Sequence, residues 1–321
     1  MPGRLTTALH AATAALLVAT IAPGAANASE TAAAAGAGAS AGNAVAAACK
    51  LVNGSVTPGG DQTATVVTAG SPPVVQVKAR YTDIYPDGQP RLSSLFASGL
   101  VLPSPGRMYY GHVVMGTGLY SSHYLVGEDG QVDRSQALND RKGGGWGDTT
   151  YLETSHPRDP DPWALTNHYR LGADGTITRW DAKGGLGWVN MQTAGGFASV
   201  KTMVLISQTA TYDTFLATTR GGALYTIRLP LTSPLKPIVK KVRDSTWQGF
   251  DALIAEKCGQ YGTLLLGIDK DTKSGYLYAV GHANGTATVI QALGKVPATF
   301  ADPVYFRHID DPDVAPLLFG E

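Results

Sequence analysis

Short alternations of apolar and polar residues dominate the chain from about residue 73 onward, and many of them end at a tight-turn signal. Examples are HYLVGEDG at 123–130, HYRLGADG at 168–175 and TFLATTRGG at 214–222. Alternation with a period of two residues predicts β-strands, and the Asp-Gly, Gly-Gly and Asn-Gly pairs predict hairpin turns between them. Stretches with helical spacing are almost absent, so we expect an all-β fold.

The turn signal occurs five times, which indicates an internal repeat. The turn glycines are Gly88, Gly130, Gly175, Gly222 and Gly285. Their spacing of roughly 40–65 residues is typical of a solenoid or a propeller, in which each repeat buries its apolar face against its neighbours. Each copy offers three or four short strands, so we predict a five-bladed β-propeller of antiparallel sheets. We expect strands from both ends of the chain to complete its last blade.

An aromatic residue follows the turn in four copies, at Trp146, Trp188, Trp247 and Phe300. A carboxylate or an amide follows each of them closely, at Asp148, Asn190, Asp251 and Asp302. An aromatic ring can cover the apolar face of a sugar, and Asp or Asn can hydrogen-bond its hydroxyls. The alternative is structural, because a Trp that recurs once per repeat often packs the sheets and an adjacent Asp or Asn often caps a turn. We take these eight residues as candidates for carbohydrate binding.

The run HYRLGADGTITRW…GLGW at 168–188 resembles the repeat of the tachylectin family of β-propeller lectins. Those repeats also pair a strand–glycine–strand hairpin with a downstream Trp. Segments 129–146 and 221–247 fit less closely, 276–300 fits with Phe in place of Trp, and the first copy, at 77–120, has the turn without a clear Trp. The resemblance covers about residues 75–321. It implies a five-bladed propeller that binds N-acetylated sugars in grooves between neighbouring blades.

Two histidines occupy equivalent places in two copies, at His123 and His168. A pair of histidines can indicate metal or acid–base chemistry. The equivalent positions of other copies are Thr214 and Gly275, so histidine is not required by the repeat. We expect both histidines to be polar groups at a strand edge or in a groove.

The N-terminal region has the features of a secretion signal followed by a low-complexity segment. Arg4 supplies a positive charge, an apolar run follows, and Ala26-Asn27-Ala28 resembles a cleavage site, which predicts a signal peptide over 1–28. Residues 29–72 are rich in small and polar residues and precede the propeller predicted over 73–321. The apolar run is too short to span a bilayer, so we expect a secreted protein without membrane insertion.

The chain has two cysteines, Cys49 and Cys258. An even number of cysteines in an exported protein indicates a disulfide, here with one pairing available. A thiol nucleophile or a metal ligand is the alternative, although neither cysteine has a histidine at a useful spacing. The disulfide would hold the N-terminal segment against the repeats.

Charge and motif content narrow the function classes. The 25 basic and 25 acidic residues give a formal net charge of zero, which argues against nucleic-acid binding. The sequence has no nucleophile elbow, zinc-protease motif, phosphate-binding loop or dinucleotide fingerprint. The run Asp269–Gly275 supplies too few side-chain oxygens for a calcium loop. We therefore expect no catalytic residues, no cofactor and no metal.

These observations favour a secreted lectin whose repeated sites bind a polysaccharide or a glycan-coated surface by multivalency. Two alternatives remain open. The first is an interaction scaffold for another secreted protein, for which we expect one apolar docking patch. The second is a propeller hydrolase or lactonase, for which we expect carboxylates or a metal converging on a central pocket.

Overall fold

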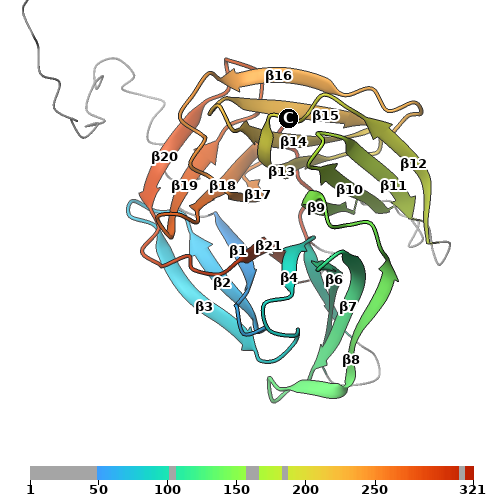
Figure 1. Ribbon diagram of the computed structural model, residues 1–321. Helices are drawn as coiled ribbons and strands as arrows, with labels where there is room; N and C mark the ends of the chain where they lie inside the picture. The colour runs from blue at the N-terminus through green and yellow to red at the C-terminus, as the bar shows by residue number, and fades with distance from the viewer. Residues whose placement is uncertain (1–48, 101–105, 157–165, 183–186, 311–314) are drawn as a thin grey trace, which may run out of the picture. The chain divides into compact units, whose positions relative to one another are not determined.

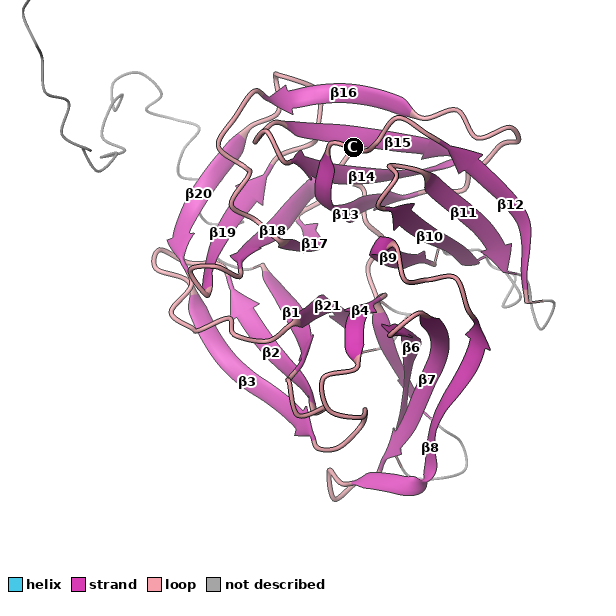
Figure 2. Ribbon diagram, in the orientation of Figure 1, coloured by secondary structure: helices cyan, strands magenta, loops and turns pink. Residues whose placement is uncertain are grey.

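The computed structural model describes residues 49–100, 106–156, 166–182, 187–310 and 315–321. These residues form 21 β-strands and no helix, which confirms the predicted all-β class (Figures 1 and 2). No helix in this described part of the chain is long and apolar enough to cross a membrane. The predicted signal peptide lies outside the described residues.

Three sheets each contain four antiparallel strands in chain order. Sheet C consists of β9 (Thr149–Ser155), β10 (Thr166–Gly172), β11 (Ile177–Ala182) and β12 (Trp188–Ala194). Sheet D consists of β13 (Val200–Gln208), β14 (Tyr212–Thr219), β15 (Leu224–Pro230) and β16 (Ile238–Arg243). Sheet E consists of β17 (Ala252–Cys258), β18 (Gly262–Asp269), β19 (Ser274–Val280) and β20 (Ile290–Lys295).

The other strands form a nine-stranded sheet with two parts, which we call sheets A and B. Sheet A consists of β21 (Val304–Ile309), β1 (Lys50–Val56), β2 (Gln62–Thr68) and β3 (Val74–Tyr81). Sheet B consists of β4 (Pro90–Ser93), β5 (Phe96–Leu100), β6 (Arg107–Met115), β7 (Gly118–Val126) and β8 (Val132–Gly143). A short parallel pairing of β21 with β5 joins the two parts.

The innermost strands of the sheets contact one another in a closed ring. Strand β4 contacts β9, β9 contacts β13, β13 contacts β17, β17 contacts β21, and β21 contacts β4 (Figure 1). Strand β21 lies late in the chain and pairs antiparallel with β1, so strands from both ends complete sheet A. A ring of antiparallel sheets closed in this way is consistent with a β-propeller, and the closure leaves no open edge between the first and last sheets.

The sheets begin earlier in the chain than residue 73, where the sequence placed the start of the repeats. Strands β1 and β2 form a hairpin inside the segment 49–72 and belong to sheet A. Leu51, Val56 and Val67 are fully or almost fully buried on that hairpin. The small and polar residues beside them give the segment its low-complexity appearance, although its Thr- and Val-rich sequence from residue 49 is compatible with a strand.

All five predicted turn glycines adopt a left-handed conformation. Their φ angles are 65° at Gly88, 75° at Gly130, 81° at Gly175, 91° at Gly222 and 55° at Gly285. The turns are not structurally equivalent, however. Gly175 and Gly222 connect the second and third strands of their sheets, whereas Gly130 connects β7 to β8, and Gly88 and Gly285 lie in loops. The repeat therefore exists, but its register differs from the one that the glycines indicated.

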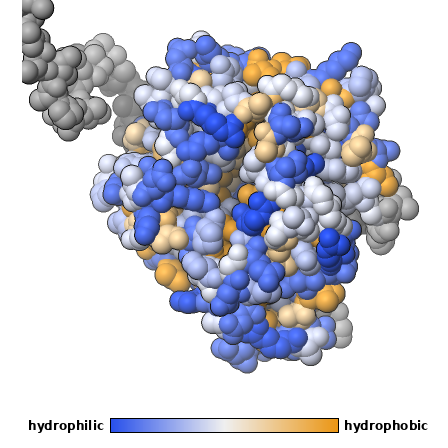
Figure 3. All heavy atoms as spheres, viewed as in Figure 1, coloured by the Kyte–Doolittle hydropathy of each residue, from blue (hydrophilic) through white to orange (hydrophobic). Residues whose placement is uncertain are grey.

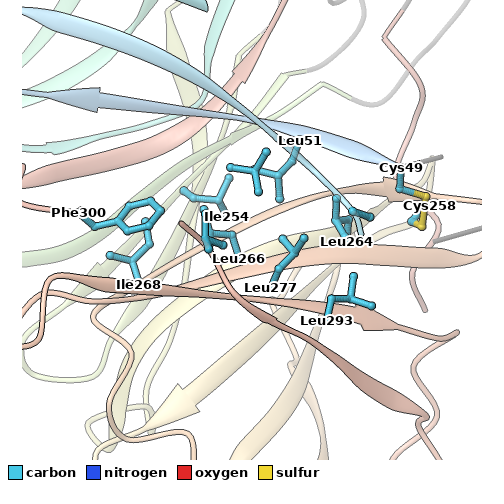
Figure 4. Packing of buried hydrophobic residues seen from close by; sticks show 13 residues of the cluster. Cys49, Leu51, Ile254, Cys258, Leu264, Leu266, Ile268, Leu277, Leu293 and Phe300 are labelled. Atoms are coloured by element: carbon cyan, nitrogen blue, oxygen red, sulfur yellow. A yellow bond between two sulfur atoms is a disulfide. The ribbon is translucent and has the colours of Figure 1, made fainter. Parts of the chain in front are cut away.

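A disulfide joins sheets A and E, as the cysteine count predicted. Cys49 precedes β1, Cys258 ends β17, and their Cα atoms are 5.4 Å apart. The bond lies beside a buried apolar cluster in which Leu51 of β1 packs with the side chains of sheet E, among them Leu264 and Leu277 (Figure 4). Covalent and apolar contacts thus hold the first strand of the described chain to the last sheet.

Candidate functional site

Three of the four predicted aromatic residues lie just after the last strand of a sheet and hydrogen-bond through their backbone to a hairpin turn of the same sheet. The backbone N–H of Trp146 donates to the Thr117 carbonyl, that of Trp247 to Gly222, and that of Phe300 to Lys273, each at 3.0 Å. Their side chains are 9%, 6% and 5% exposed. This is the position that the packing alternative describes, and it leaves little ring surface for a sugar.

The same backbone hydrogen bond identifies two aromatic residues that the sequence analysis missed. Tyr85 donates to the Gly60 carbonyl at 3.0 Å, and Phe197 donates to the Gly175 carbonyl at 2.9 Å. Tyr85 therefore takes the repeated position in sheet A, and Phe197 takes it in sheet C. Trp188 instead begins the outer strand β12. Spacing measured from the turn between the second and third strands identifies these aromatic residues, whereas spacing from any turn glycine does not.

The four predicted polar partners make contacts within the protein. The Asp148 carboxylate pairs with Arg170, and the Asp302 carboxylate accepts a hydrogen bond from the Ser55 hydroxyl. Asp251 pairs with Lys201 at 2.9 Å and also accepts the Lys270 backbone N–H. Asn190 donates to Asp181 at 3.2 Å and has a φ of 51°. Sugar contacts by these residues stay a prediction.

Two of the predicted tryptophans come together in a cluster of aromatic rings between sheets B and C. The His168 and Trp188 rings stack at a centroid distance of 4.1 Å. The His112 ring stands edge-on to both, 5.0 Å from each. Trp146 also packs edge-on against Trp188, with the ring centroids 5.8 Å apart. His168 thus lies at a groove, as expected, and its ring stacks on Trp188.

A cavity of about 80 Å³ lies in front of these histidines, and we call it the B/C groove. Strands of sheet B and sheet C line it with apolar groups, among them Leu95 and Ala97, and with side chains able to hydrogen-bond: Tyr110, His112, Ser121, Thr154, His156 and His168. The hydroxyl of Thr154 is 3.1 Å from His168 Nδ1, which fixes the orientation of that ring. Tyr110, which is also part of the lining, is 36% exposed.

Burial controls the charge of the two central histidines. It lowers the pKa of His112 to about 4, and Lys142 adds to the effect. Burial also places the pKa of His168 well below its ordinary value, with a further contribution from His112. Both rings are therefore neutral near pH 7, and a neutral imidazole offers one hydrogen-bond donor and one acceptor. The groove is suited to an uncharged polar ligand.

A second cavity, of about 60 Å³, lies among the innermost strands. The face of the molecule seen in Figure 3 is hollowed near its centre, and strongly hydrophilic residues lie beside the hollow. The Glu153 carboxylate in its lining accepts the backbone N–H groups of Leu95 and Thr154 at 3.0 and 2.8 Å, and burial raises its pKa. Arg307 pairs with Glu256 at 2.9 Å. Across the described ranges, no group of three or more His, Cys, Asp or Glu side chains is placed to hold a metal ion.

Comparisons with known proteins yield distant structural likenesses. No protein-family model and no curated protein matches the chain. The solved structure of SapL1 lectin in complex with alpha methyl fucoside matches with 10% identity, a TM-score of 0.40, and coverage of 77% of this chain and 81% of the lectin chain. The complex of the fission yeast SREBP–SCAP binding domains matches with 10% identity, a TM-score of 0.33, and coverage of 74% and 62%. Likenesses this distant assign neither a family nor a ligand.

Proposed function

We propose that the protein is a secreted, five-bladed β-propeller that binds a neutral sugar in the B/C groove and catalyses no reaction. The ring of innermost strands and the five aromatic residues with equivalent backbone hydrogen bonds support a count of five blades. The disulfide is consistent with an oxidising, extracellular location. The residues of the groove support the binding function.

The observation that carries the proposal is the pairing of aromatic faces with neutral hydrogen-bonding groups in one groove. A pyranose ring has an apolar face that packs on aromatic rings and hydroxyls that need donors and acceptors. Tyr110 supplies an exposed ring, and the two neutral histidines, Ser121 and Thr154 supply hydrogen-bonding groups. The groove lining contains no Asp, Glu, Lys or Arg among the described residues, so a neutral ligand meets no unpaired charge. N-acetylated sugars are the first class to test, because the tachylectin-like repeat implies them.

The test is a calorimetric titration of the protein with N-acetylglucosamine, N-acetylgalactosamine, glucose and α-methyl fucoside at millimolar concentrations. We expect at least one of these sugars to bind, and Tyr110→Ala to weaken that binding about tenfold or more through the loss of ring contact. Tyr261→Ala is the matched control, because Tyr261 is a 52% exposed tyrosine of sheet E, at the β17–β18 turn.

Two results would contradict the proposal. The first is no binding of any sugar in the panel, which would favour the interaction-scaffold alternative. The second is equal weakening by the Tyr110 and Tyr261 variants, which would place the sugar outside the B/C groove. A stoichiometry of one sugar per chain is expected, because this combination of rings and hydroxyls occurs between sheets B and C.

A further inference from the structure

A larger groove lies at the boundary of sheets A and B and has a different chemistry. It has a volume of about 440 Å³, within the range of pockets that hold small organic ligands. Its lining includes Gln89 from the loop after β3, Arg91 from β4, the turn between β6 and β7, Tyr120 from β7, and Arg141 from β8. We call it the A/B groove.

Two arginines face this groove without a neutralising acid. No Asp or Glu is among the described residues that line it. The nearest acid along β8, Asp140, pairs with Lys142 at 2.6 Å. The groove therefore carries two positive charges that an anion could neutralise, and a cleft with charge of one sign attracts the opposite charge.

The two arginines are held differently. The Nε of Arg91 donates to the Gly116 carbonyl at 2.9 Å, and its Nη2 donates to the carbonyls of Trp146 and Gly147 at 3.0 and 3.1 Å. These bonds fix the guanidinium and leave its Nη1 uncommitted within the described part of the chain. Arg141 makes neither a hydrogen bond nor an ion pair with any described residue. One arginine is thus a fixed charge, and the other has its whole donor fork available.

A glycine brings the free arginine next to an aromatic ring. Tyr120 and Arg141 lie directly opposite each other on β7 and β8. A Cβ at Gly118 would be 2.9 Å from Tyr120 Cε2 and 3.2 Å from Arg141 Nε, so any side chain there would displace the ring or the guanidinium. Gly118 does not have a left-handed φ, so the space above it, and not its backbone conformation, accounts for the glycine.

We propose that the A/B groove binds a sugar ring that carries a carboxylate, such as a uronate. Arg141 would hold the planar carboxylate with two parallel hydrogen bonds, a geometry that suits a guanidinium better than an ammonium. Arg91 would add a second, fixed positive charge. The half-buried ring of Tyr120 would contact the apolar face of the sugar. This site is separate from the neutral B/C groove and has a different ligand class.

The test is a titration of the full chain with methyl β-D-glucuronide and, as the uncharged control, methyl β-D-glucoside. We expect the glucuronide to bind about tenfold or more tightly than the glucoside, because the charge-assisted bonds require the carboxylate. Arg141→Gln should remove that difference. Lys142→Gln removes the same charge from the next residue of β8, which does not line the groove, and should keep the difference. Added salt should weaken glucuronide binding.

Four results would overturn the proposal. They are no glucuronide binding, equal binding of both glycosides, equal loss in the two variants, and displacement of the glucuronide by equimolar inorganic phosphate. The last result would indicate a general anion site. N-acetylglucosamine binding reports on the B/C groove separately, so a failure of that proposal would not be mistaken for a failure of this one.

Discussion

Asp213 lies in the core between sheets C and D, and its burial gives a sharp prediction about stability. Its side chain in β14 is completely buried. Its Oδ2 accepts the hydroxyl of Tyr169 at 2.7 Å and the amide of Asn167 at 3.3 Å, whereas Oδ1 has no hydrogen-bond partner among the described residues. Burial raises the pKa of Asp213 from 3.8 to about 7, against the opposing effect of its hydrogen bonds.

The sign of the pH effect follows from this shift. Because the pKa is raised in the folded state, the contribution of Asp213 to stability is fully present below pH 3.8 and is lost as the pH rises through 7. Between pH 5 and pH 8 the loss amounts to about 2–3 kcal/mol. Asp213→Asn removes the titration, and the amide oxygen can still accept from Tyr169. Any fixed cost of the new amide group is the same at every pH.

Urea unfolding of the wild type and the Asp213→Asn variant at several pH values between 5 and 8 measures this effect. We expect the variant to gain about 2–3 kcal/mol relative to the wild type over that range. Tyr169→Phe serves as a second variant, because loss of its hydroxyl removes a donor to the carboxylate and should extend the stability loss to higher pH. A difference between Asp213→Asn and wild type that stays constant from pH 5 to pH 8 would refute the reasoning.

Three further predictions concern the architecture. Replacing both Cys49 and Cys258, which lie 209 residues apart, by Ala should lower the free energy of unfolding by about 5 kcal/mol in the chain-entropy model, as measured against wild type in denaturant. Trp247→Ala should cost about 3–5 kcal/mol, because the ring is buried in the core of sheets D and E, and a smaller loss would contradict the packing role. Gly175→Ala should lower the unfolding temperature far more than Gly88→Ala. Both glycines have a positive φ, but a Cβ at Gly175 would lie 2.0 Å from the Ala198 backbone nitrogen, whereas a Cβ at Gly88 would have no atom within 4 Å.

Many of the strands and turns after residue 73 were predictable because both depend on local chemistry. Alternation of apolar and polar residues indicates one buried face, and glycine is favoured where a tight turn needs a positive φ. Gly175 and Gly222 are examples in which the local signal and the repeat position coincide. The pairing of Cys49 with Cys258 was also predictable, because the chain has no other cysteine.

The register of the repeat was not predictable from the same signals. Trp188 and Phe197 both follow glycines in the third copy, and the pattern favoured the tryptophan. The structure distinguishes them by a backbone hydrogen bond from Phe197 to Gly175, which depends on how β11 and β12 lie. The number of residues between a glycine and an aromatic residue does not show whether the two are joined by such a hydrogen bond.

The B/C groove was harder to predict from the sequence than the register of the repeat. His168 was noted as a groove residue, but His112 was not, because its neighbours come from another sheet. The neutral state of both rings results from burial, which the sequence does not report. The A/B groove was also not predicted, because Arg91 of β4 and Arg141 of β8 line one groove only once the chain has folded into sheet B.

The recurring contacts explain why the grooves differ from one another. The bond that closes each repeat runs from a backbone N–H to a backbone carbonyl, so it constrains an aromatic ring and a turn but not the side chains that face a neighbouring sheet. Groove residues can therefore change without loss of the fold. Neutral histidines line one groove and unpaired arginines line another. Binding at these grooves should then be specific to each ligand class, with one site per class, and not a sum over five equivalent sites.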